Sequence, residues 1–111
     1  MTKLGFAAQL ADDLSPDDLR LVLTVFQTDV TRLTGALADA ARLDDDTAFR
    51  RAAHGLAGAA GAVGAAGLEQ ASRQAMAEDT IAGAGLEVIV ALAEKALADL
   101  AELLARLGPA A

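Results

Sequence analysis

The chain has 111 residues, of which 54% are hydrophobic but only 3% aromatic, and it contains no cysteine. This length fits one domain, residues 1–111, and the lack of cysteine excludes disulfides and Cys-ligated zinc. The formal net charge of −7 repels phosphate backbones, so nucleic acid is not an expected partner. A composition rich in alanine and leucine favours helices, and we expect an all-α protein.

The first predicted element is a short amphipathic helix over residues 3–12, because Leu4, Phe6 and Leu10 recur at helical spacing. This N-terminus lacks the sustained apolar run of a signal peptide. The uncharged stretch 52–68 is short for a membrane span and contains a histidine, so no membrane partner is expected. A cytoplasmic location is compatible with the absence of cysteine.

Ser15 and Pro16 then predict the start of a long helix over residues 16–41, since serine caps and proline suits the first helical position. Asp44-Asp45-Asp46-Thr47 predicts the next start. A calcium loop would need ligands at alternating positions and a turn glycine, so we interpret the run as a cap for a helix over residues 46–63.

Gly64-Ala65-Ala66-Gly67 predicts a bend. Two further helices are expected over residues 65–78 and 86–107, the last stopped by Gly108-Pro109. Four amphipathic helices with short connections predict an antiparallel four-helix bundle, with the short N-terminal helix as an extra element.

His54 is the only histidine of the chain, so its direction on the helix is informative. At about 100° per residue, Phe49, Leu56 and Val63 fall on the side opposite His54. Arg50 and Arg51 fall within about 60° of it. The imidazole is therefore predicted to face solvent beside two cations.

Ala57, Gly58 and Gly61 follow His54 on the same predicted face. A glycine inside a helix costs about 1 kcal/mol relative to alanine. One reason to accept this loss at Gly55, Gly58 and Gly61 is the close approach of another backbone or of a partner helix, and glycines beside a reactive side chain would leave room for a partner to dock. The alternative explanation for these glycines is a compositional drift of the sequence towards glycine and alanine. The alternative for His54 is an ordinary surface histidine without a function.

The segment around this histidine resembles the histidine-containing phosphotransfer (HPt) domain family. The family pattern has an Ala-His pair, Leu two residues later, Gly four residues later and Gly-Ala about ten residues later. The matching residues here are Ala53, His54, Leu56, Gly58, Gly64, Ala65 and Leu68. The lysine that the family usually carries three residues after the histidine is Ala57 here.

The resemblance implies a bacterial phosphorelay intermediate of two-component signal transduction. His54 would accept a phosphoryl group through Nε2 from a phosphorylated receiver domain or a hybrid histidine kinase and pass it to another receiver aspartate. Response-regulator receiver domains would bring the Mg²⁺, so no cofactor or metal of the chain's own is expected. The glycines are not followed by Lys-Ser or Lys-Thr, so no ATP-binding loop and no kinase activity are expected.

Two groups of residues accompany His54 in this interpretation. Arg50, Arg51 and Arg73 are the candidates for stabilising the phosphate, because a guanidinium favours bidentate phosphate contact. The candidates for docking a partner are Ala57, Gly58, Gly61, Gln70 and Gln74. A solvated face is the alternative for Gln70, Arg73 and Gln74, and a monomer is the expected state.

Three other functions stay open at this point. The missing lysine favours a degenerate, non-phosphorylated helical interaction module. A sensor-kinase dimerisation domain also displays a helical histidine, but an acidic residue usually follows it, and here Gly55 does. A hydrolase or metal enzyme has little to build on, since Ser15 and Ser72 have no evident base partner.

Overall fold

The computed structural model describes residues 13–81 and 85–108. These residues form helices and no strand, which confirms the all-α prediction for this part of the chain. The four helices are α3 (Pro16–Arg42), α4 (Asp46–Val63), α5 (Ala66–Ala77) and α6 (Leu86–Leu107). Their ends agree with the predicted ranges to within one residue. The helix expected over residues 3–12 lies outside the described residues.

Side-chain caps fix the starts of the first two of these helices. The Ser15 Oγ accepts the N–H of Asp18 at 3.2 Å, directly before Pro16 opens α3. In the same way, Asp45 Oδ1 accepts the N–H of Ala48 at 3.1 Å and caps α4. These bonds satisfy backbone donors that have no partner within the helix, so the aspartate run acts as a helix start.

Gly64 ends α4 and produces the predicted bend. It adopts a left-handed conformation with φ 77°, which a side chain would disfavour. The next residue, Ala65, donates its N–H to the Ala60 carbonyl at 2.8 Å, which closes the turn. The chain then reverses into α5.

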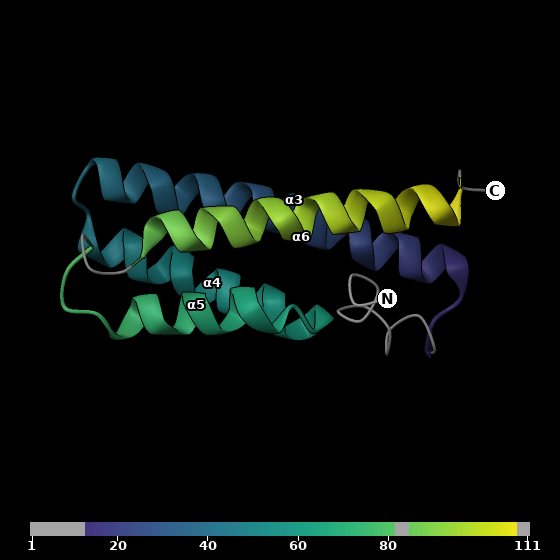
Figure 1. Cartoon of the computed structure of the whole chain (residues 1–111), viewed down its shortest axis with the longest axis horizontal. Helices are drawn as coiled ribbons and strands as arrows, with labels where there is room; N and C mark the ends of the chain where they lie inside the picture. Colours follow the sequence, from purple (N-terminus) through teal and green to yellow (C-terminus); the bar gives the residue numbers. More distant parts are fainter. Residues whose placement is uncertain (1–12, 82–84, 109–111) are drawn as a thin grey trace.

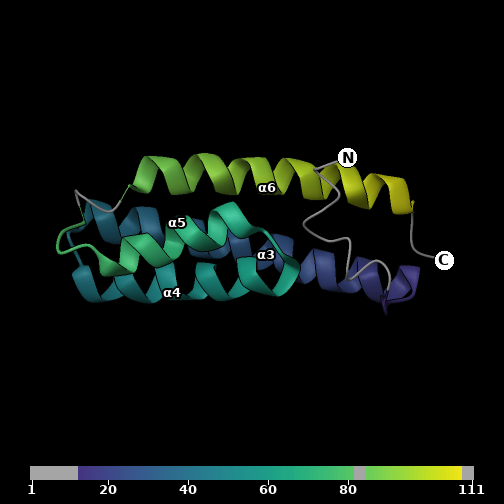
Figure 2. The ribbon, with the colours of Figure 1, turned by 60° about the horizontal axis from the view of Figure 1, so that its bottom comes forward.

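The helices form a bundle in which each lies beside two others (Figure 1). α3 contacts α4 and α6, and α5 contacts the same two helices from the other side. In both views, helices that follow one another in the chain run in opposite directions (Figure 2). α3 and α6 are the longest, with 27 and 22 residues, and one end of this pair projects beyond α4 and α5.

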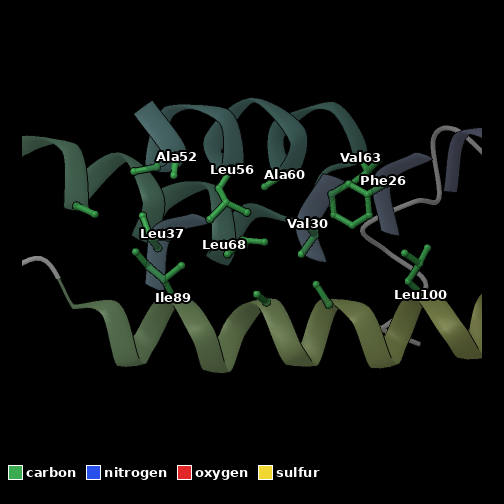
Figure 3. Packing of buried hydrophobic residues seen from close by; sticks show 14 of the residues in the cluster. Phe26, Val30, Leu37, Ala52, Leu56, Ala60, Val63, Leu68, Ile89 and Leu100 are labelled. Atoms are coloured by element: carbon green, nitrogen blue, oxygen red, sulfur yellow. The ribbon is translucent and has the colours of Figure 1, made fainter. Parts of the chain in front are cut away.

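The core lies between the helices and consists of aliphatic side chains, alanines and two phenylalanines. Phe26 and Val30 of α3, Leu56 of α4, Leu68 of α5 and Ile89 of α6 point into the space between the helices and belong to one core cluster (Figure 3). Burying these faces supplies the main stabilisation of the bundle. None of the helices in the described ranges is long and apolar enough to cross a membrane.

The projecting end is tied together by Arg20. Its Nε donates to the Gly108 carbonyl at 3.2 Å and its Nη2 to the Leu107 carbonyl at 3.1 Å. A cation at the last carbonyl groups of α6 also complements the negative end of the helix dipole. The contact therefore joins the start of α3 to the end of α6.

Candidate functional site

His54 lies in the middle of α4 and is exposed to solvent. Phe49, Ala53 and Leu56 of the same helix are buried in the core. This confirms the direction predicted from the helical spacing. The imidazole is therefore accessible to another protein, while the backbone that carries it is held in place by the packing of α4.

Arg50 lies one turn before His54, but its guanidinium is occupied elsewhere. It donates Nη1 to the Met76 carbonyl and Nη2 to the Glu78 carbonyl, the latter at 2.7 Å, and its Nε pairs with Asp46 at 3.1 Å. Met76 and Glu78 are at the end of α5, where a cation complements the helix dipole. Arg50 therefore joins α4 to α5, and this role was missed by the sequence analysis.

Arg73 is also paired. Its Nη2 and Nε lie 2.7 and 3.1 Å from Glu69 Oε2, one turn earlier on α5. Arg51 differs from both: it is exposed on α4, and no hydrogen bond or ion pair of its side chain is found among the described residues. Of the three arginines predicted to stabilise phosphate, Arg51 is thus the one whose guanidinium is not already engaged.

The glycines of α4 have different surroundings. A Cβ on Gly55 would come within 3.0 Å of the Leu33 side chain, and one on Gly61 within 3.0 Å of the Glu69 carboxylate. These two glycines therefore give room to the chain's own side chains. A Cβ on Gly58 would meet nothing within 4 Å, so the open surface beside His54 is at Gly58.

The expectation that Ala57 lies on the docking surface is wrong. Its side chain is only 2% exposed. Ala57 sits about 60° from His54 around the helix axis, on the side opposite Arg51, and α5 packs along α4. A partner protein cannot reach Ala57 without displacing its neighbours.

The two glutamines of α5 are exposed, but neither lies on the side of α5 that faces α4 and His54. Gln74 follows Gly67 by two turns and shares its side of α5, and a Cβ on Gly67 would contact Leu92 of α6 at 3.6 Å. Gln74 therefore faces the α6 side, and Gln70 lies on the outer face of α5. Glu69, which reaches over Gly61, was not predicted; its spacing of four residues from Arg73 was the available indication.

The surface around the histidine thus consists of His54, Arg51 and Gly58, bordered by the Glu69–Arg73 ion pair. No group of three or more residues able to hold a metal ion is found in the described ranges. The arrangement can present one nucleophilic ring nitrogen to an incoming group, with one unengaged cation close by in sequence.

Comparison with protein families identifies the family of the chain. Residues 21–108 match the family described as Hpt domain. No curated protein and no solved structure matches the chain significantly. The matched range includes α4, α5 and α6 entirely and most of α3.

Proposed function

Since this match covers most of its length, the chain belongs to the Hpt domain family, and we propose that it is a phosphorelay intermediate carrying the phosphoryl group on His54. Members of this family take part in histidine phosphotransfer without kinase activity of their own. The observation that carries the proposal is the position of the only histidine, exposed in mid-α4 beside an open glycine.

The reaction is a phosphoryl transfer between two side chains. The Nε2 of neutral His54 attacks the phosphorus of a phosphoaspartate on a receiver domain. A P–N bond forms as the P–O bond to the aspartate breaks, and the aspartate leaves as a carboxylate. In the reverse direction, an aspartate of a second receiver attacks the phosphohistidine, and the group moves on. Little covalent chemistry is required beyond positioning and charge neutralisation.

Arg51 is the residue that we assign to charge neutralisation on this chain. It lies about 60° from His54 around α4, on the side away from α5, and its guanidinium has no other partner among the described residues. A guanidinium can donate two hydrogen bonds to phosphate oxygens. The receiver supplies the Mg²⁺, and the chain supplies the nucleophile and one cation.

Gly58 is where the receiver approaches. It lies one turn after His54, and the space above it is open. A side chain there would separate the two proteins, and a phosphoaspartate must come within bonding distance of the ring. The proposed partners are the receiver domains of a hybrid histidine kinase and of a response regulator, in a bacterial cytoplasm.

A labelling assay tests the proposal. The chain is incubated with a phosphorylated receiver domain, and the transferred label is examined for the acid lability and base stability of phosphohistidine. We expect label on the native chain and none on His54→Gln. Arg106→Gln, which changes an exposed residue of α6, is the matched control and should label normally. Label on His54→Gln would contradict the site, and no label on the native chain would favour the non-phosphorylated interaction module.

A further inference from the structure

The outward face of α3 carries apolar side chains that the bundle does not cover. Leu21 is 64% exposed and Val25 52% exposed, one helical turn apart. They lie on the side of α3 opposite Leu19, Leu23 and Phe26, which enter the core. Residues 21–28 contain no charged side chain, although the chain as a whole is strongly acidic.

Two threonines complete this face without adding unsatisfied polar groups. Thr24 donates its hydroxyl to the Arg20 carbonyl at 2.8 Å, and Thr28 donates its hydroxyl to the Thr24 carbonyl at 3.1 Å. Because both hydroxyls already have acceptors within the helix, a partner that covers these residues would not leave a buried hydroxyl without a hydrogen bond. Leu21, Thr24, Val25 and Thr28 together form what we call the α3 stripe.

The charges at the two ends of the stripe are complementary to each other. Asp17 lies at one end, where it pairs with Arg20 at 2.9 Å, and Arg32 lies at the other end, 3.6 Å from Asp29. Because the side chains of Asp17 and Arg32 are exposed, these pairs within α3 contribute little and can be exchanged for partners on another molecule. If two copies of α3 pack antiparallel about an axis between Thr24 and Val25, each residue faces its counterpart across that axis. Asp17 then faces Arg32 of the second copy, and Leu21 faces Thr28.

From this pattern we infer that a second copy of the chain binds the α3 stripe, giving a symmetric dimer through an antiparallel α3 pair. A self-complementary patch of this kind is what a two-fold interface requires. The contact involves few turns of helix, so it falls below the roughly 1,200 Å² of standard interfaces and gives a weak, reversible dimer. This departs from the monomer expected from the sequence. The inference does not depend on the function of His54, which is on another helix.

Sedimentation equilibrium of the full chain over micromolar to millimolar concentrations tests the dimer. We expect the average mass to rise from one copy towards two. Leu21→Lys combined with Val25→Lys should weaken the association at least about tenfold, because two apolar contacts per copy become like charges. Val88→Lys is the matched control, since Val88 is 57% exposed on α6, and it should dimerise as the native chain does.

Charge exchange tests the antiparallel register. Asp17→Arg alone and Arg32→Asp alone should each raise the dissociation constant of the dimer by roughly three- to tenfold. Each change gives positions 17 and 32 the same charge, and these positions face each other twice in the symmetric dimer. An equimolar mixture of the two variants should regain the native association, because their charges are again opposite. Circular dichroism checks that each variant is folded.

A native chain that stays monomeric at all concentrations would overturn the inference, and so would a dimer that survives the double lysine change. A mixture of the two charge variants that associates no better than each variant alone would also overturn it. A monomer is the result expected if residues 1–12, or no segment at all, cover the α3 stripe. The phosphoryl labelling of His54 is a measurement independent of the association state. It should be equal in the native chain and in the double lysine variant, so a failure of the dimer and a failure of the phosphocarrier role are distinguishable.

Discussion

Arg50 and Arg51 are neighbours in sequence, but the structure gives them different surroundings, and exchanging each for glutamine tests whether their roles differ as well. Arg50 donates to the Met76 and Glu78 carbonyl groups at the end of α5. Arg51 has no such contact in the described part of the chain. We therefore expect Arg50→Gln to reduce stability and Arg51→Gln to reduce the rate of phosphoryl transfer.

The size of the stability effect follows from the contacts. A hydrogen bond from a charged donor contributes about 1.5–3 kcal/mol when it is well shielded. The Arg50 side chain is 37% exposed, so water replaces part of what is lost, and its ion pair with Asp46 contributes little. We expect Arg50→Gln to lower the free energy of unfolding by about 1–2 kcal/mol and the melting temperature by roughly 5–10 °C. Arg51→Gln should change the free energy of unfolding by less than about 0.5 kcal/mol.

The assay combines thermal unfolding with the rate of transfer from a phosphorylated receiver, measured well below the melting temperature of both variants. Arg51→Gln should slow transfer about tenfold, corresponding to about 1.4 kcal/mol of transition-state stabilisation, and Arg51→Lys should recover part of this because it keeps the charge. Arg50→Gln should transfer at close to the native rate. The opposite pattern, with Arg50→Gln slow but as stable as the native chain, would refute the assignment.

Three further predictions rest on single residues. Gly58→Ala should raise the free energy of unfolding by about 0.5–1 kcal/mol, because alanine favours the helix more than glycine and nothing obstructs its methyl group. Gly58→Arg should keep the fold but slow phosphoryl transfer, and an unchanged transfer rate would argue against docking at Gly58. Ser72→Ala should raise the free energy of unfolding by about 1 kcal/mol in urea titrations, because the buried Ser72 hydroxyl has no hydrogen-bond partner among the described residues. A loss of stability would indicate a partner for this hydroxyl. Gly64→Ala should lower the free energy of unfolding by about 1–2 kcal/mol, because Gly64 has φ 77°, and a neutral result would contradict this role as the left-handed cap.

The helices could be predicted closely because their determinants are local. Ser15 and Asp45 cap through bonds three residues away, and Gly64 ends α4 by its own backbone conformation. The direction of His54 needed only the helical period. The partners of Arg50 could not be predicted, since they lie 26 and 28 residues further along the chain. The burial of Ala57 likewise depends on which side of α4 receives α5, and helical spacing alone does not contain this information.

The glycines of α4 show how one sequence pattern can have several causes. Gly55 accommodates Leu33 of α3 and Gly61 accommodates Glu69 of α5, so close packing within the bundle is sufficient to account for both. Only Gly58 has no neighbour that a methyl group would touch, and its cost in helix stability is not offset by any contact of this kind. The case for a docking surface therefore rests on Gly58 alone.

The replacement of the family's usual lysine by Ala57 has a geometric consequence. Position 57 is covered by the packing of α5, so a lysine there would reach solvent only by extending its stem out of the helix contact. Arg51 lies at a similar angle on the other, open side of His54. Under the proposed function, Arg51 would supply the cation from the side of the imidazole away from α5, whereas a lysine at position 57 would supply it from the side that α5 covers. A receiver that approaches over Gly58 would meet the guanidinium directly, and the phosphoryl group would be held between that guanidinium and the receiver's own metal ion.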